Sequence, residues 1–104
     1  MQADIEQKRE ALAALCRRYG VARLEVFDSA ARGAGFDPNR SDADFLVTFA
    51  PEARNDLAVF ADLQEALERL LGRAVDLVER EAIETSRNFI RRRAILREAE
   101  TVYG

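Results

Sequence analysis

The segment from Asp42 to Phe49 constrains the fold of this chain most strongly, because one of its two alternating faces is wholly apolar. The residues on that face are Ala43, Phe45, Val47 and Phe49, and they alternate with Asp42, Asp44, Leu46 and Thr48. A period of two predicts a strand with one side buried against a core. The apolar face therefore needs a covering layer from elsewhere in the chain.

Segments with helical spacing lie on both sides of this strand. Residues 4–19 predict an amphipathic helix, with Gly20 in the position of a C-terminal cap. After Pro51, Asn55 or Asp56 can cap a second helix that runs to about residue 71 and is closed by Gly72. The apolar side chains expected to face the core are Ile5, Ala11, Leu12 and Leu15 in the first helix and Leu57, Phe60, Leu63, Leu67, Leu70 and Leu71 in the second.

Two short apolar runs complete the predicted sheet. Residues 21–27 are rich in Val, Leu and Phe and predict a strand, and the brief apolar run 74–78 predicts another. Residues 79–102 are predicted to be helical with a break near Ser86, and their apolar contacts are assigned to Ile83, Phe89, Ile90, Ile95 and Leu96. This order of elements predicts an α/β (α+β) fold, a mixed β-sheet packed against helices.

Length and composition exclude several classes of function. With 104 residues there is room for one core, so residues 1–104 are interpreted as a single domain. The net charge of -3 disfavours direct nucleic-acid binding, which depends on a basic surface. The lone Cys16 and the absence of histidine exclude an intramolecular disulfide, the common zinc-ligand sets and histidine-dependent catalysis. A polar N-terminus without a long apolar stretch favours a cytoplasmic protein with no membrane segment.

Asp42 and Asp44 are the first candidates for chemistry. Two residues apart on a strand, they leave the same face at a spacing of roughly 6.6 Å. Their repulsion, on the order of 2.5 kcal/mol at an effective dielectric of 20, can be offset by solvent, an arginine or a divalent cation. Mg²⁺ is the natural cation, because it prefers a few carboxylates together with water and phosphate oxygens. The alternative is two solvated acids on an exposed strand.

Asp76 adds a third carboxylate, since it interrupts the apolar run 74–78, where a buried charge would need a partner. If this strand lies beside residues 42–49, Asp76 can complete a cluster that holds one or two Mg²⁺ ions for phosphoryl transfer. A salt bridge to Arg73 is the alternative.

The turn over residues 28–33 has the composition of an anion site. Its backbone N–H groups could meet a phosphate, Arg32 would add positive charge, and Ser29 could donate a hydrogen bond. Ser29 and Gly33 could equally serve only as cap and turn residues.

Taken together, Ser29, Arg32, Gly33, Ser41, Asp42, Asp44 and Asp76 follow the motif order of the minimal nucleotidyltransferase family of the DNA polymerase beta superfamily. The chain resembles this family over nearly its whole length. The resemblance implies a catalytic palm alone and a Mg²⁺-dependent transfer of a nucleoside monophosphate, usually from ATP, to an acceptor hydroxyl. It also implies that Asp42, Asp44 and Asp76 hold two metal ions, while Ser29, Arg32, Gly33 and Ser41 bind the nucleotide.

The family motif has glycine where this chain has Asp28. A negative side chain at that position opposes the approach of a triphosphate, although Asp28 could also cap the following turn. Two hypotheses follow: an active nucleotidyltransferase, or a protein of the same fold with weak or no catalysis that acts as a stoichiometric binding antitoxin or scaffold. A structural Asp cluster in an unrelated α/β domain is a third possibility.

The resemblance also implies a protein partner, because members of the family are often encoded beside a HEPN ribonuclease toxin and some adenylylate it. The run Arg91–Arg93 could contact nucleotide, RNA or an acidic partner, or could be a solvated face. The apolar C-terminal segment could pair two chains into a homo-oligomer or pack on its own sheet.

Overall fold

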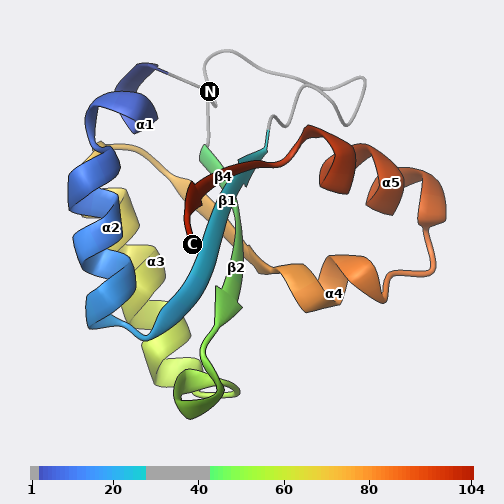
Figure 1. The fold of residues 1–104 in the computed structure, drawn as a ribbon, viewed down its shortest axis with the longest axis horizontal. Helices are drawn as coiled ribbons and strands as arrows, with labels where there is room; N and C mark the ends of the chain where they lie inside the picture. Colours follow the sequence, from blue (N-terminus) through green and yellow to red (C-terminus); the bar gives the residue numbers. More distant parts are fainter. Residues whose placement is uncertain (1–2, 28–42) are drawn as a thin grey trace.

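A mixed β-sheet forms the centre of the computed structural model, which describes residues 3–27 and 43–104 (Figure 1). Within those residues the sheet has four strands in the order β3-β2-β1-β4. The strands are β1 (Val21–Phe27), β2 (Ala43–Phe49), β3 (Val75–Glu79) and β4 (Glu100–Tyr103). β1 runs antiparallel to both β2 and β4, whereas β2 and β3 are parallel. The predicted α/β class with a mixed sheet is confirmed.

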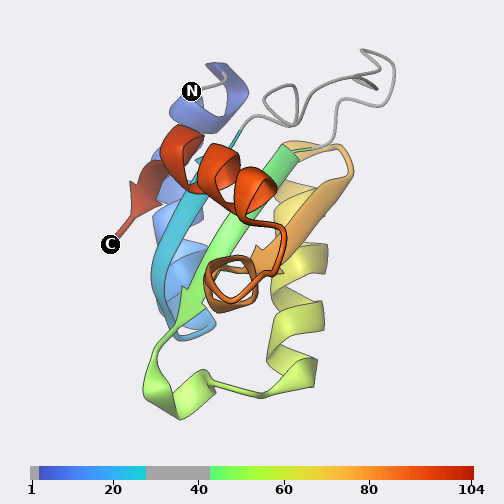
Figure 2. The same ribbon diagram turned by 90° about the vertical axis from the view of Figure 1, so that its right-hand side faces the viewer.

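Helices cover both faces of the sheet. Figures 1 and 2 show α2 and α3 on one side and the α4–α5 pair on the other. The helices are α1 (Ala3–Gln7), α2 (Arg9–Arg18), α3 (Leu57–Leu71), α4 (Arg80–Glu84) and α5 (Phe89–Glu98), with the 3₁₀ turn η3 at Pro51–Ala53. Because parallel strands need a crossover, α3 joins β2 to β3 as a βαβ unit.

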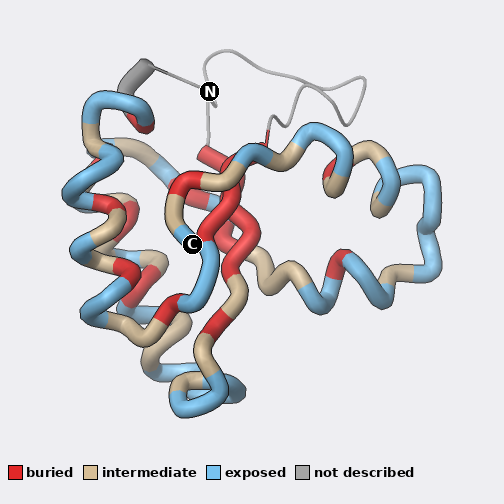
Figure 3. The backbone as a smooth tube through the Cα atoms, in the orientation of Figure 1, coloured by how far each residue is buried: buried red, intermediate tan, exposed pale blue. Residues whose placement is uncertain are grey.

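The larger core lies between the sheet and the layer of α1, α2 and α3. All four apolar residues of the alternating face of β2 are buried in it, together with Leu12 and Cys16 of α2 and Leu63 and Leu67 of α3. Figure 3 shows that the buried residues are concentrated along the strands and on the sides of the helices that face them. The apolar face of residues 43–49 is thus covered by a layer of helices, as the sequence predicted.

A smaller core lies on the opposite face of the sheet. It joins Phe27 of β1 and Leu46 of β2 to Ile83 of α4 and Ile95 of α5. The α4–α5 layer is therefore held by few apolar contacts.

The prediction of one continuous helix over residues 4–19 is wrong, because the segment is divided into α1 and α2 at Lys8. There the Lys8 amide donates to the carbonyl of Ile5, three residues back, and the Lys8 ammonium donates to the carbonyl of Leu70 at 2.6 Å. Ile5 is fully buried as predicted, but Ala11 is exposed and Cys16 takes the expected place in the core.

The caps of α3 agree with the sequence. Asp56 accepts hydrogen bonds from the amides of Ala58 and Val59, and Gly72 closes the helix with φ of +69°. Leu57, however, is 83% exposed and does not face the core, contrary to the sequence prediction. It occupies the first residue of the helix, beyond the end of the stripe that meets the sheet.

The C-terminal region differs from its prediction in one element. The break near Ser86 is confirmed, because α4 ends at Glu84 and α5 begins at Phe89. The segment predicted to remain helical as far as Val102 instead ends in β4, which pairs with β1. Thr101 to Tyr103 favour a strand, and pairing satisfies the backbone groups along the open edge of β1.

Phe89 and Ile90 are also exposed, at 61% and 71%, rather than packed in the core as predicted. In the part of the chain that is described, no helix has the length and apolarity needed to cross a membrane.

Two leucines of α3 test the assignment of its buried side. Leu63→Ala should lower the free energy of unfolding by about 2–5 kcal/mol, because Leu63 is fully buried between helix and sheet. The same truncation at the exposed Leu57 should change it by less than about 0.5 kcal/mol. Urea unfolding followed by circular dichroism measures both, and equal losses would contradict the orientation of α3.

Candidate active site

Asp44 and Asp76 are brought together by the parallel pairing of β2 and β3. They are register partners on these neighbouring strands, and each is the second residue of its strand. In-register residues of adjacent strands project from the same face of a sheet. The expectation that the strand of Asp76 lies beside the strand of Asp44 is therefore confirmed.

The two carboxylates differ in exposure, and the difference reverses the sequence interpretation. Asp44 lies on a central strand and is 2% exposed, whereas Asp76 lies on the edge strand β3 and is exposed. The expectation that Asp76 was the buried charge is wrong, because an edge strand leaves its polar side chains accessible to solvent. The pair thus joins a buried, fixed carboxylate to one that solvent can reach.

The face that carries this pair is the one beneath α4 and α5. Leu46, two residues after Asp44, packs against Ile83 and Ile95 on that face. Phe27 of β1 is the register partner of Asp44 on the other side. Asp44 consequently lies between an aromatic residue of one strand and a carboxylate of the other.

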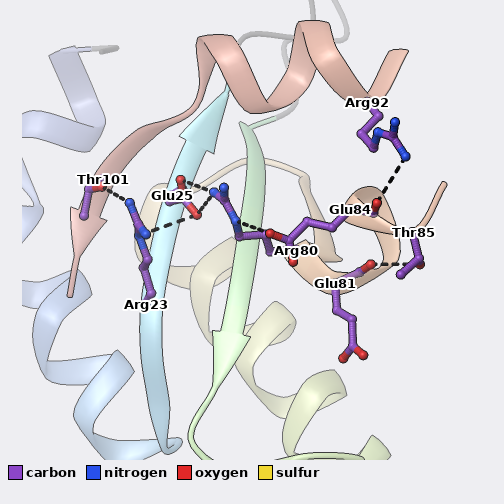
Figure 4. A network of polar contacts seen from close by, with 8 residues as sticks. All are labelled: Arg23, Glu25, Arg80, Glu81, Glu84, Thr85, Arg92 and Thr101. Atoms are coloured by element: carbon purple, nitrogen blue, oxygen red, sulfur yellow. Dashed lines mark hydrogen bonds and ion pairs between the residues drawn. The ribbon is translucent and has the colours of Figure 1, made fainter. Parts of the chain in front are cut away.

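A second polar cluster on the same face was missed by the sequence analysis. Glu25 of β1 is 3% exposed, and Nη1 of Arg80 donates to both of its carboxylate oxygens at 2.6 and 2.7 Å (Figure 4). Nε of Arg23 lies 3.7 Å from Oε1 of Glu25 and Nε of Arg80 lies 3.2 Å from Oε2 of Glu84. These contacts tie α4 to β1 across the sheet. Glu25 was visible as a charge within an apolar run, but its partner is 55 residues away in the chain.

The positive charge of Arg80 persists over the usual range of pH. The hydrogen bond that Arg80 donates to Glu25 raises the pKa of Arg80 above its ordinary high value, so the guanidinium remains protonated. Cys16 offers no competing chemistry, because burial raises the pKa of its thiol to about 12 and keeps it protonated.

Five of the seven predicted site residues, Ser29, Arg32, Gly33, Ser41 and Asp42, lie outside the described residues, as does Asp28. Within residues 3–27 and 43–104 no group of three or more His, Cys, Asp or Glu side chains is placed to hold a metal ion. Two carboxylates at neighbouring strand positions, about 5 Å apart, repel by roughly 3 kcal/mol at an effective dielectric of 20. A hard divalent cation that keeps water or phosphate ligands suits such a pair.

Comparison with known proteins identifies the family. The model of the nucleotidyltransferase domain matches residues 8–98 of this chain. The chain belongs to the nucleotidyltransferase family. The protein adenylyltransferase MntA of Thermococcus cleftensis is 41% identical to it over 71 residues, which are 68% of each chain.

Solved structures share the fold. A candidate minimal nucleotidyltransferase has 38% identity and a TM-score of 0.65, with 92% of this chain and 90% of that chain covered. The complex of a tri-AMPylated HEPN toxin with an MNT antitoxin from Shewanella oneidensis contains a chain with 17% identity and a TM-score of 0.62. That match covers 96% of this chain and 72% of the other. The resemblance to minimal nucleotidyltransferases drawn from the sequence is confirmed.

The Glu25–Arg80 pair can be tested by a double-mutant cycle. Arg80→Met should lower the free energy of unfolding by about 2–3 kcal/mol, because it leaves the buried Glu25 carboxylate with only the longer contact to Arg23. Adding Glu25→Leu removes the buried charge and should recover most of that loss. Urea unfolding of the wild type, both single variants and the double variant gives the coupling energy, and a value near zero would contradict the pairing.

Proposed function

We propose that this nucleotidyltransferase is a Mg²⁺-dependent adenylyltransferase that transfers AMP from ATP to a hydroxyl group of a HEPN-type toxin and so acts as an antitoxin. The observation that carries the proposal is the in-register pair Asp44 and Asp76. Support for AMP transfer comes from the name of the T. cleftensis relative. Support for the partner comes from the S. oneidensis complex. The proposal places the protein in the cytoplasm, where ATP and Mg²⁺ are available.

The transfer has a simple balance of bonds. The acceptor oxygen attacks the α-phosphorus of ATP, the bond from that phosphorus to the bridging oxygen breaks, and pyrophosphate leaves while the hydroxyl proton passes to a base or to water. When bound, Mg²⁺ supplies positive charge that stabilises the phosphate oxygens and favours deprotonation of the acceptor hydroxyl. Asp42, Asp44 and Asp76 are the proposed ligands.

The burial of Asp44 gives it a positioning role in this scheme. A carboxylate fixed on a central strand keeps its orientation without reorganising during the reaction, and such preorganisation lowers the barrier to charge development. Asp76, which is exposed on the edge strand, is the carboxylate that an incoming acceptor hydroxyl can approach. Ser29, Arg32, Gly33 and Ser41 are proposed to bind the triphosphate.

The function is tested by AMP transfer. Wild-type protein incubated with α-³²P-labelled ATP, Mg²⁺ and a HEPN toxin should label the toxin, and EDTA should abolish labelling. Asp44→Asn and Asp76→Asn should each lower the rate by at least roughly 100-fold, because each removes a carboxylate that faces the reacting phosphate. Asp62→Asn, on an exposed side of α3, is the matched control and should retain the rate. Full activity of Asp44→Asn would exclude the proposed site.

Asp28 favours a second candidate function, that of a stoichiometric antitoxin or scaffold that binds its partner without transferring AMP. Asp28→Gly should bind Mg-ATP about tenfold more tightly than the wild type, because it removes an anionic side chain at the position where the family motif has glycine. Calorimetric titration of both proteins measures this, with Asp42→Asn/Asp44→Asn as the negative control. Metal-dependent binding to the wild type supports the enzyme, whereas binding only after Asp28→Gly supports the second candidate.

A further inference from the structure

The outward side of α5 carries a short stripe of apolar residues, of which Phe89 and Ile90 are exposed and Ala94 is half-buried. Phe89 and Ile90 lie on its first turn, and Ala94 follows one turn later on the same side. Together with Arg93 and Arg97 they line a shallow groove of about 260 Å³. Residues 89–97 span about 12 Å of helix axis, so the groove follows the helix for two turns.

The packing of α5 on the sheet does not use this stripe. On its inner side α5 already packs against the sheet through Ile95, which is 1% exposed, and through the partly buried Leu96. Figure 1 shows the α4–α5 pair projecting from the sheet on the side away from α2 and α3. A surface helix that presents apolar residues on two opposite sides has two packing surfaces, of which the fold occupies one.

The charge around the stripe indicates what it can contact. α5 carries Arg91, Arg92, Arg93 and Arg97 against the single acid Glu98, in a chain whose net charge is -3. Arg92 is turned inward, where its Nη1 donates to the carbonyls of Glu84 and Ser86 at 3.3 and 3.2 Å. Arg93 and Arg97 line the groove itself. The groove therefore combines apolar side chains with two positively charged ones.

We propose that the outer side of α5 is a docking surface for an amphipathic helix of a protein partner, with apolar residues that enter the groove and Asp or Glu residues that pair with Arg93 and Arg97. A groove two turns long that combines apolar and basic side chains fits the helix-in-groove mode, in which anchors at positions i, i+3 or i+4 enter the groove. The volume is below the usual range for a small-molecule pocket but accommodates such anchor side chains. The inference rests on the proposed function only in that the partner is a protein acceptor.

Other occupants fit the surface less well. A nucleic acid is held mainly by phosphate contacts to many basic groups, whereas this groove is lined by two arginines and by Phe89 and Ile90. A second copy of the chain would need an acidic apolar surface such as the one around Leu57. There, however, the Asp56 carboxylate is already engaged as the cap of α3, and a head-to-tail contact of this kind would not close into a dimer.

A panel of fluorescent probes tests the docking surface on the intact protein. The first probe is a 20-residue helical peptide with leucines at i, i+3, i+4 and i+7 and glutamates on the flanks. The second has the same composition in scrambled order, the third has lysine in place of glutamate, and the fourth is a 20-nucleotide single-stranded RNA. Anisotropy should show saturable binding of the first peptide, at least tenfold weaker binding of the other three, and weakening by 0.5 M NaCl.

Variants locate the binding on α5. Phe89→Ser/Ile90→Ser and Arg93→Glu/Arg97→Glu should each weaken binding of the acidic helical peptide at least tenfold. Leu57→Ser, a change at an equally exposed apolar residue on another helix, should not. Thermal unfolding followed by circular dichroism controls for folding. The α5 variants should have the same unfolding midpoint as the wild type, because the changed side chains are exposed.

Several results would overturn the proposal. The proposal fails if the acidic helical peptide does not bind, if the scrambled peptide binds as tightly as it does, or if RNA binds more tightly. It also fails if the sedimentation coefficient rises with protein concentration and Phe89→Ser/Ile90→Ser removes that rise, because the surface would then pair two copies of the chain. Asp44→Asn should lower the rate of AMP transfer at least roughly 100-fold while leaving peptide binding intact, and the α5 variants should leave Mg-ATP binding intact. The docking proposal and the proposed enzymatic function are thus tested by different measurements, so that one can fail without the other.

Discussion

The parallel pairing of β2 with β3 is the contact on which the architecture of this protein depends. The helix α3 connects these two strands, and its buried leucines fill the space over the apolar face of β2. The same pairing fixes the register that sets Asp44 beside Asp76. A shift of one residue would turn both the apolar set and the carboxylate to the wrong faces. The stability of the core and the geometry of the candidate site are therefore consequences of one register.

The opposite face of the sheet is organised by fewer contacts. A modest apolar cluster and the buried Glu25–Arg80 pair hold the α4–α5 layer over the face that carries Asp44. Since a buried ion pair is costly to leave half-satisfied, it specifies one placement of α4 more than it adds net stability. This layer leaves the outer side of α5 to solvent, and the proposed docking surface follows from that arrangement.

Sequence reasoning located most of the secondary structure because each element carries a local signal. The alternation in residues 43–49, the Asp56 cap and the positive φ of Gly20 and Gly72 all involve residues within a few positions of one another. It was wrong where a tertiary contact outweighed the local pattern. A tight turn at Lys8 divides the first helix, and the last residues join the sheet as β4. Of the seven predicted site residues, Asp44 and Asp76 lie side by side as expected, and the other five lie outside the described residues.

The sequence by itself determined the family motif, the order of the strands and helices as far as α5, and the side of β2 that is buried, since periodicity and motif spacing are properties of neighbouring residues. Only the tertiary structure decided which carboxylate is buried, because that depends on the place of each strand in the sheet. Glu25 and Arg80 meet only through folding, since the pair spans 55 positions. Phe89 and Ile90 are apolar like core residues, yet they are exposed because Ile95 occupies the side of α5 that meets the sheet.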